Sequence, residues 1–517
     1  MLRLVILPAM LISFATTIYY YYNYRVIEKP SLNYIITETA GPDSFDPLDA
    51  DKTQNIAVMR MLYGSPLEIN ASNQLVSNVL EKFEYNPLTT TITFTAKKSI
   101  FYENGHAITP YDIAFAIARF AYYRPKFPVI KDIQGVEQWA SEKKGLGRFP
   151  AGILVENLDI KIKLVRAHSN PLFRFCLEVF SIIPASCVDQ SSGKLVCDLP
   201  PASGNFKIKK REGSMIVFSK RTIDPIEKID YESITFKYES LSQLCENPIS
   251  DDSVVAANEI DYLNLSCDVN LSNFNLAWMP SSRFAILRFN PNVDPFKQNK
   301  NRQYFSEKVR ERLREKNKNM LVERGLFSSL LPGYISSEDI GHNFDDIDIS
   351  NFANKEIKIP INAAPGFKHI YDSINDVANT LKMKVEYFKN TDANDLLAGF
   401  LANSMSVLVG ASGFWAQDPV GDISMWFTPG LHKTMSFAWA DKQIYSQLSE
   451  IESETDAIIL TDKLKNFNRY VSQQSVLVPI IHFRRVFITS INSKNYEIPQ
   501  AVAAPAPWQI RVRNKWK

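Results

Sequence analysis

The sequence predicts an α/β protein built from more than one folding unit. Segments typical of strands and of helices alternate irregularly, and the chain contains neither internal repeats nor low-complexity tracts. Its 517 residues are too many for a single hydrophobic core. A hydrophobic content of 45% and an aromatic content of 12% are enough to fill several cores, which excludes a largely disordered chain.

The N-terminal segment has the length of a membrane span. Residues 4–22 are uncharged, mostly apolar and flanked by arginines. A small-residue cleavage site at 13–15 would make this segment part of a signal peptide. The aromatic cluster at the end of the run is typical of the membrane interface and favours an uncleaved anchor. Both alternatives stay open.

A capped helix that begins at Pro110 is the clearest local element. Thr109 can cap this helix, and Asp112 stands at its third position, so the two residues are expected to form a capping box. Residues 91–94 alternate as in a strand, and the Asn-Gly pair at 104–105 provides a turn. The predicted unit is strand, turn, helix, which is common in α/β proteins.

The same stretch resembles a family signature. Gly105, Ile108-Thr109 and Asp112-Ile113 resemble a motif of the family 5 extracellular solute-binding proteins of ABC importers, the oligopeptide- and dipeptide-binding group, with one residue inserted before the glycine. Weaker matches follow in the family's order at residues 44–47, 61–67, 201–206, 289–310, 415–419 and 478–480.

The resemblance implies the two-lobe architecture of a type II periplasmic binding protein, with discontinuous lobes and an extra subdomain in lobe one. Two apolar segments, near 283–290 and 476–483, would then cross between the lobes. Paired crossings let the lobes rotate and close a cleft over a ligand. The implied boundaries are 1–30 for the signal peptide or anchor, 31–60, 186–280 and 481–517 for lobe one, 61–185 for its subdomain, and 281–480 for lobe two.

A cleft for an extended polar solute needs backbone hydrogen-bonding groups, charged groups for the ends of the solute, and aromatic walls. The resemblance places one cleft edge at 41–44 and the facing segment at 407–419. Further aromatic or cationic residues are candidates for the walls of the cleft, and the alternative for each of them is a purely structural role. The candidate ligand-binding residues are Gly41, Pro42, Asp43, Tyr122, Arg124, Trp278, Gly413, Phe414, Trp415 and Asp418.

The predicted ligand is a peptide or a similar small polar solute. Oligopeptide binders hold the peptide amine with an aspartate, and Trp415 stands at that position here. The lost charge-assisted bond is worth about 1.5 to 3 kcal/mol, so either Asp43 or Asp418 replaces it, or the ligand is a sugar or another polar metabolite stacked on Trp415. The expected partner is an ABC permease. The alternative function is a diverged, membrane-tethered homologue that acts as a scaffold or sensor without transport.

Composition and motifs give no support for other functions. The formal net charge of +2 leaves no electrostatic footprint for nucleic acid. Residues 297–318 are rich in basic side chains interleaved with glutamates, which predicts a solvated helix with paired charges. Residues 410–413 miss the Gly-x-Ser-x-Gly nucleophile motif by one residue. We therefore expect no enzyme, no cofactor and a monomeric binding protein.

The five cysteines lie in the first half of the chain, without the short spacings of a zinc site. In an oxidising compartment Cys187 could pair with Cys197, and Cys245 with Cys267, each bond stabilising by about 2 to 4 kcal/mol; buried free thiols are the alternative. The first cysteine is Cys176, so none is placed to carry a lipid anchor after a signal sequence. Together with the resemblance, this favours a periplasmic location, either free or tethered to the inner membrane by residues 4–24.

Overall fold

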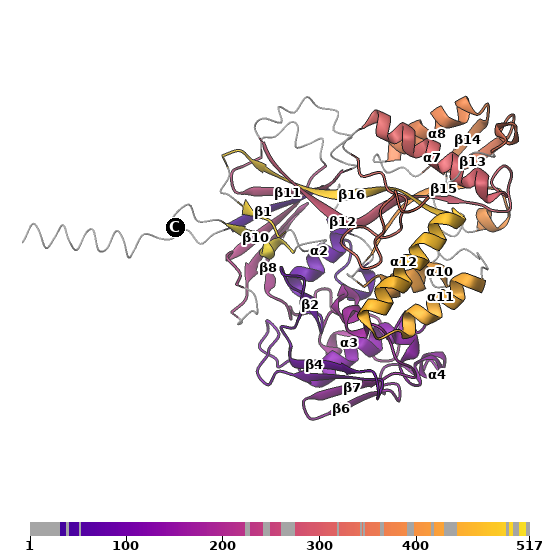
Figure 1. Ribbon diagram of the computed structural model, residues 1–517. Helices are drawn as coiled ribbons and strands as arrows, with labels where there is room; N and C mark the ends of the chain where they lie inside the picture. Colours follow the sequence, from indigo (N-terminus) through magenta and orange to yellow (C-terminus); the bar gives the residue numbers. More distant parts are fainter. Residues whose placement is uncertain are drawn as a thin grey trace, which may run out of the picture.

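A computed structural model shows how the chain is arranged (Figure 1). Within the described part, no helix is long and apolar enough to cross a bilayer. The candidate span at 4–22, Trp415, Cys245 and Cys267 lie outside the described residues. The structure describes residues 31–37, 41–50, 53–222, 228–240, 249–259, 274–317, 320–341, 344, 347–361, 367–389, 398–414, 418–428, 442–492, 496–499 and 506–512.

The largest element of the described chain is an eight-stranded sheet with the order β15-β12-β16-β11-β1-β10-β9-β8. β1 is parallel to both of its neighbours, and the other pairs are antiparallel. The strands are β1 (Ser31–Ile36), β8 (Phe206–Glu212), β9 (Met215–Lys220), β10 (Ser233–Tyr238), β11 (Ser253–Asn258), β12 (Phe274–Phe289), β15 (Val407–Gly413) and β16 (Leu477–Ser490).

The two longest strands of this sheet, β12 and β16, pair with each other along most of their length (Figure 1). The C-terminal half of β16 also pairs with β11, whereas the C-terminal half of β12 also pairs with β15. The ladder is irregular next to Pro280 and near Pro479, where the missing N–H of proline is tolerated. Both segments predicted as crossings, near 283–290 and 476–483, therefore lie in this strand pair.

A separate four-stranded sheet with the order β4-β5-β7-β6 carries α3 and α4 and forms the lower part of the molecule in Figure 1. The predicted strand, turn and helix are confirmed as β5 and α3. Thr109 Oγ1 accepts from Asp112 N, and Thr109 N donates to the Asp112 carboxylate, which completes the capping box. The elements are β4 (Leu80–Asn86), β5 (Thr91–Ala96), β6 (Ile153–Glu156), β7 (Asp159–Lys163), α3 (Pro110–Tyr123) and α4 (Val136–Ser141).

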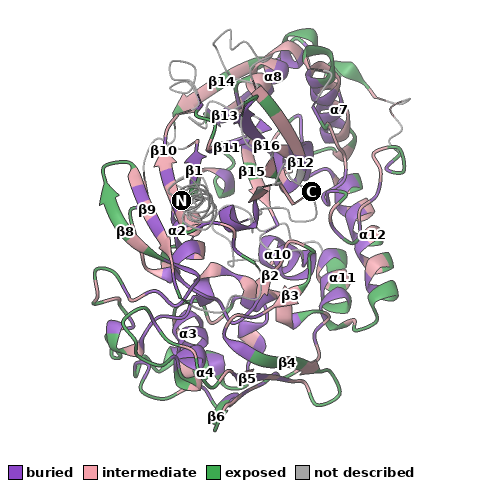
Figure 2. Ribbon diagram, turned by 90° about the vertical axis from the view of Figure 1, so that its left-hand side faces the viewer, coloured by how far each residue is buried: buried purple, intermediate pink, exposed green. Residues whose placement is uncertain are grey.

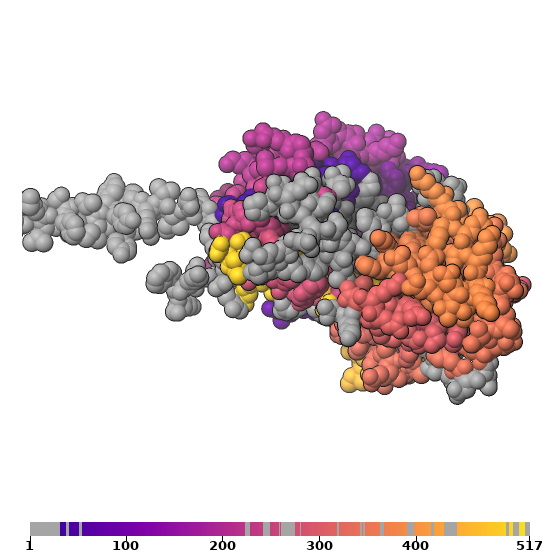
Figure 3. Space-filling view, turned by 90° about the horizontal axis from the view of Figure 1, so that it is seen from above, coloured from indigo at the N-terminus to yellow at the C-terminus, as the bar shows by residue number. Residues whose placement is uncertain are grey.

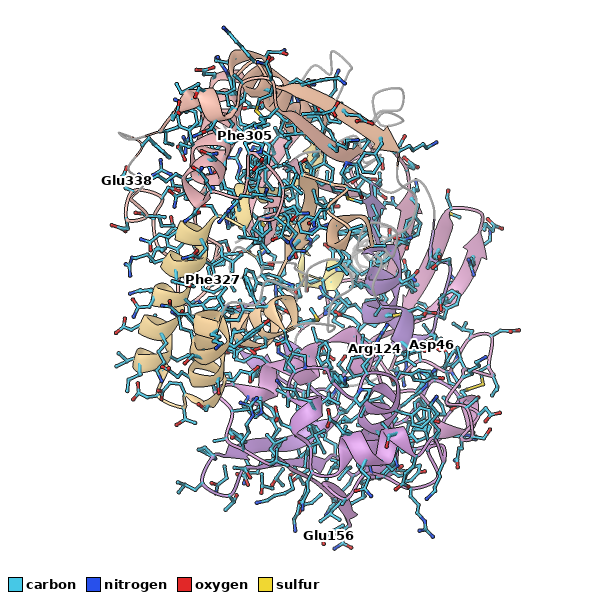
Figure 4. The ribbon with its side chains drawn as sticks, turned by 90° about the vertical axis from the view of Figure 1, so that its right-hand side faces the viewer. Asp46, Arg124, Glu156, Phe305, Phe327 and Glu338 are labelled. Carbon is cyan, nitrogen blue, oxygen red and sulfur yellow. A yellow bond between two sulfur atoms is a disulfide. The ribbon has the colours of Figure 1, made fainter. Side chains whose placement is uncertain are left out.

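A second α/β layer lies at the far end of the large sheet, beside β15. In the space-filling view its orange residues form one end of the molecule, apart from the indigo and magenta residues of the first half (Figure 3). Phe305 of α7 lies in its core with residues of β12, β15 and β16 (Figure 4). The layer contains α7 (Asn299–Lys316), α8 (Lys368–Thr380), β13 (Glu356–Ile361) and β14 (Lys384–Lys389).

The basic helix predicted at 297–318 is α7, but the expectation of a solvated helix is only partly right. Lys308 with Glu311, and Arg312 with Glu315, form exposed pairs as expected. Arg310 is buried instead, because its guanidinium donates to Pro479 O at 2.6 Å and pairs with Glu307. Glu307 lies on the same helix, but the carbonyl of Pro479, which also offsets the desolvation cost of this cation, comes from a distant segment that a local charge pattern does not reveal.

Three further helices run from the second layer down towards the four-stranded sheet, on the right of Figure 1. Their apolar residues belong to the same core as those of α2, α3 and the large sheet. Figure 2 shows buried residues in α2 and α3 and exposed residues on the edge strands β4 and β8. The remaining elements are α2 (Thr53–Leu62), α10 (Pro419–Phe427), α11 (Lys442–Ser453), α12 (Ala457–Gln474), β2 (Glu68–Ile69), β3 (Leu75–Val76), β17 (Tyr496–Glu497) and β18 (Arg511–Val512).

The cysteines follow the prediction where they are described. Cys187 and Cys197 form a disulfide and close the polar loop between them. Cys176 is a free thiol, and burial raises its pKa well above the usual value. A reactive thiolate is therefore disfavoured at this position.

Candidate functional site

The predicted cleft edge at 41–43 follows β1 and is fastened to neighbouring elements. Pro42 O accepts from Arg211 Nη2 of β8 at 3.2 Å. Asp43 is exposed, and its backbone N and its Oδ1 both bond to the amide of Asn55 in α2, at 3.2 and 2.9 Å. Because Asn55 is itself buried, the edge is held in a fixed position. Gly41 lies against the ring of Tyr238.

The facing segment begins where β15 ends. Gly413 is paired with Arg283 of β12, and a Cβ added to Gly413 would lie 2.8 Å from Arg283 Cγ, so only glycine fits this close approach. Phe414 was predicted to line the cleft, but its ring is buried. It packs 4.7 Å from the ring of Trp426 and 5.3 Å from that of Phe327. Its side chain contributes to the core of the protein.

Asp418 was predicted as a ligand-binding carboxylate, and the structure places it in a different environment. Its Oδ1 caps α10 by accepting from Val420 N at 3.0 Å, and its Oδ2 accepts from Arg174 Nε at 3.2 Å. The residue is buried. The Asp-Pro pair at 418–419, which resembled a family motif, is a helix start with proline in the first turn.

The other wall candidates are spread over the molecule. Trp278 of β12 packs in a small core on one face of the large sheet, and its ring stacks under the guanidinium of Arg484 at 4.5 Å. Tyr122 is half-buried beside Trp139. Arg124 is exposed at the end of α3, where Figure 4 shows it at the level at which the four-stranded sheet and its helices meet the rest of the molecule. The structure therefore does not bring these three side chains together.

The structure reveals a buried ionic contact that sequence reasoning missed. Arg174 follows Pro171 in a short 3-10 helix near the four-stranded sheet and is only 1% exposed. Its Nη1 pairs with Asp422 Oδ1 at 3.2 Å, its Nη2 donates to Asp418 O at 2.8 Å, and its Nε donates to Asp418 Oδ2. A Cβ added to Gly421 would lie 1.9 Å from Arg174 Cζ. The first turn of α10 thus encloses this guanidinium.

A second ionic cluster lies where α11 meets the same part of the molecule. Glu452 of α11 pairs with Arg166 and, at 3.3 Å, with Lys131. Asp132 accepts from Arg166 Nε at 3.0 Å and lies 2.9 Å from His168 Nε2. Burial alone would raise the pKa of Asp132, but the hydrogen bonds from His168 and Arg166 outweigh it and lower the pKa to about 2.

These two clusters join segments that are far apart in the sequence. Arg174 and Asp422 are separated by 248 positions, and Arg166 and Glu452 by 286. The backbone adds a bond of 3.1 Å from Ser169 N to Glu452 O. The arrangement therefore fastens α10 and α11 to the residues around the four-stranded sheet, and the apolar core is continuous across the contact.

The structure offers no catalytic constellation at the segments that sequence analysis considered. Residues 410–413 lie within β15, where Ser412 pairs with Phe284, so they do not form the strand-to-helix turn of a nucleophile motif. Within the described ranges, no group of three or more His, Cys, Asp or Glu side chains could hold a metal ion.

Comparison with known structures identifies the architecture. NikA from Brucella suis, solved with Fe(III)-EDTA, is similar with a TM-score of 0.73 and 14% identity, over 94% of this chain and all of that one. A dipeptide-binding protein from Pseudoalteromonas sp. SM9913 with bound Met-Leu has a TM-score of 0.70 and 14% identity, over 93% of this chain and all of that one. These are family 5 periplasmic solute-binding proteins of ABC importers.

The chain has the two-lobe fold of a periplasmic binding protein. The oligopeptide-binding protein OppA from Haemophilus influenzae is also similar, with a TM-score of 0.69 and 12% identity, over 94% and 99% of the two chains. No protein-family model matches the sequence, and no curated protein does. The fold implied by the resemblance is thus confirmed by structure, at sequence identities that leave the ligand to be inferred from the residues of this chain.

Proposed function

We propose that the protein is a solute-binding receptor of an ABC importer, and that it holds a small polar solute in a cleft between its two lobes. The observation that carries this proposal is the fold, which covers 94% of the chain when aligned with binding proteins of this type. The paired strands β12 and β16 supply the double connection that lets two lobes rotate about a few residues.

The proposed lobes are those expected from the sequence. Lobe one would combine residues 31–60, 186–280 and 481–517 with the subdomain 61–185, and lobe two would span 281–480. In support, all buried residues of the second core except Ile481 and Phe483 lie within 281–480. With these boundaries Arg174 and Glu452 take part in contacts between the lobes, so the structure corresponds to a closed arrangement.

The proposed ligand is a peptide or another small polar solute. The structural neighbours were solved with Met-Leu, with a nine-residue peptide and with agropinic acid, so one fold accommodates chemically different solutes. In this chain Asp418 is occupied by Arg174, which leaves the exposed Asp43 as the candidate for a ligand amine. We further propose that Gly41, Pro42 and Gly413 line the cleft and that Trp415 contacts the solute.

The proposed partner is an ABC permease that recognises the closed, loaded state. A periplasmic location follows from the nature of the neighbours, and tethering by residues 4–24 is part of the same proposal. The receptor would act as a monomer.

The experiment that tests the receptor function is a thermal-shift titration of the protein against pools of peptides, oligosaccharides and small organic acids. A solute at about one hundred times its dissociation constant should stabilise the folded state by about 2.7 kcal/mol. Replacement of Trp415 by alanine should weaken this binding. Absence of a saturable response to every pool would contradict the receptor function and favour a scaffold.

A further inference from the structure

Two arginines of the large sheet, Arg283 and Arg485, have an environment that differs from that of the other arginines in the interior. Arg485 lies on β16, and Arg283 lies on β12, at the irregular part of the ladder between the two strands. Both side chains are half-buried. Within the described part of the chain neither guanidinium donates a hydrogen bond or forms an ion pair.

The alternation of the strands shows which way Arg485 faces. Phe487 of β16 belongs to the main core, together with Tyr34 of β1 and Met279 of β12, whereas Val486 and Ile488 belong to the small core on the opposite face. Arg485 is two residues from Phe487 and therefore lies on the face that carries Tyr34. This is the face covered by α2 in Figure 1.

Three arginines, Arg60, Arg283 and Arg485, lie close enough together for their charges to interact. Burial lowers the pKa of Arg485, and the charges of Arg283 and Arg60 lower it further, which places the three groups within electrostatic range. Arg60 of α2 is compensated by its ion pair with Glu178. Tyr34 also interacts with both Arg485 and Arg60. Among the residues that the structure describes, no carboxylate pairs with Arg283 or Arg485.

The rest of the interior shows how this chain treats buried guanidinium groups. Arg119 pairs with both oxygens of Asp46 at 2.7 Å, and Arg484, next to Arg485 but on the other face, pairs with Glu259. Arg302 donates to backbone carbonyls. Partly desolvated like charges destabilise a protein when they have no partner, and the described residues provide none for this pair, so we infer that a bound group compensates them.

The position of the pair connects it with the proposed cleft. Arg283 is the strand partner of Gly413, from which the chain leads to Trp415. Arg485 belongs to the second of the two strands that cross between the lobes. An anion between the two arginines would thus lie at the hinge, where it contacts both crossing strands and the edge of lobe two.

We propose that the transported solute is anionic and that its carboxylate or phosphate group binds between Arg283 and Arg485. Guanidinium groups match both oxyanions because two parallel N–H donors face two oxygens. This proposal rests on the receptor function proposed above and adds the chemical class of the solute.

The test compares matched probes on the full-length protein. Acidic di- and tripeptides and small dicarboxylates are titrated beside the corresponding amides, and sugar phosphates beside the free sugars, with thermal shift and calorimetry as readouts. An anionic probe is expected to bind at least tenfold more tightly than its neutral counterpart. The arm that responds identifies carboxylate or phosphate as the source.

The variants Arg485→Gln and Arg283→Gln are expected to weaken binding of the anionic probe by about tenfold to a hundredfold each, since each removes a charge-assisted interaction. Arg485→Lys keeps the charge but not the fork of donors and should fall in between. Arg312→Gln, which removes one positive charge from the exposed face of α7, is the matched control and should bind as the wild type does.

The stability of the unliganded variants distinguishes a binding role from a structural one. Arg485→Gln is expected to leave the unfolding temperature unchanged or to raise it, because it removes an uncompensated charge. A clear decrease would show that Arg485 is a structural residue and would overturn the proposal. Binding of neutral probes alone would overturn it while the receptor function stands, and absence of all binding would contradict both.

Discussion

Two groups of arginines, one beside α10 and α11 and one on the strands β12 and β16, differ in whether the protein provides a counter-charge for them. Arg174 and Arg166, at the contact of α10 and α11 with the residues around the four-stranded sheet, each form ion pairs with two carboxylates. Arg283 and Arg485, on the crossing strands, have none within the described residues. The protein thus provides its own counter-charges where α10 and α11 are fastened to the rest of the molecule, whereas the described residues provide none for Arg283 and Arg485, where we expect a ligand to do so.

The largest expected effect comes from breaking the fully buried group. Arg174→Met should lower the free energy of unfolding by about 3 to 5 kcal/mol, because it removes the guanidinium that pairs with the buried carboxylates of Asp418 and Asp422. Urea unfolding followed by fluorescence measures this change. The double variant Arg174→Met with Asp422→Leu should recover part of the loss. A wild-type unfolding curve for Arg174→Met would show that the contact is absent in solution.

Gly421→Ala tests the same contact without a change of charge. The added methyl group would collide with the guanidinium of Arg174, and overpacking of this kind costs about 1 to 3 kcal/mol. Gly147→Ala is a suitable control, since no atom lies within 4 Å of the methyl group that it adds. Equal unfolding temperatures of the two variants would contradict the enclosed position of Arg174.

Glu452→Gln weakens the second cluster, which is less buried than the first. It removes one charge that faces both Arg166 and Lys131, so a smaller loss is expected, about 1 to 3 kcal/mol. If the cluster holds the lobes together, small-angle scattering should also show a larger radius of gyration for the unliganded variant. If neither the radius of gyration nor the free energy of unfolding changed, the cluster would not contribute to closure.

The pH dependence of the free energy of unfolding separates the contribution of Asp132 from that of Glu307. The folded pKa of Asp132, about 2, lies below its ordinary value of 3.8, so its contribution is complete above pH 3.8 and is lost as the pH falls towards 2. In Asp132→Asn this part of the acid dependence should disappear, while the part due to Glu307, whose pKa is also lowered to about 2, remains. Unfolding curves between pH 2 and 5 measure the difference, and parallel profiles would contradict it.

Local signals predicted the parts of the fold that depend on local interactions. The capping box of α3 was found because Thr109, Pro110 and Asp112 act within one turn. Cys187 and Cys197 were predicted to pair because a short polar loop separates them. The apolar, strand-like character of the two segments that the resemblance marked as crossings is confirmed in β12 and β16, but the pairing of these strands with each other was not predicted.

The parts that sequence reasoning missed depend on distant partners. Asp418 carries the same local pattern whether its second oxygen is free for a ligand or bound to Arg174, which lies 244 positions away. Arg310 was expected in solvent because nothing near it in the chain reveals the carbonyl of Pro479. Likewise, the half-buried Arg283 and Arg485, which have no partner among the described residues, are recognised only when their environment is compared with that of paired arginines such as Arg119 and Arg484.

The most direct test of the account is a side-by-side titration of the wild type and the double variant Arg283→Gln with Arg485→Gln against one pool of small anionic solutes, followed by thermal shift. We predict saturable stabilisation of the wild type and none of the double variant. Equal stabilisation of both proteins, or no stabilisation of either, would contradict the claim that this two-lobe protein closes on an anionic solute.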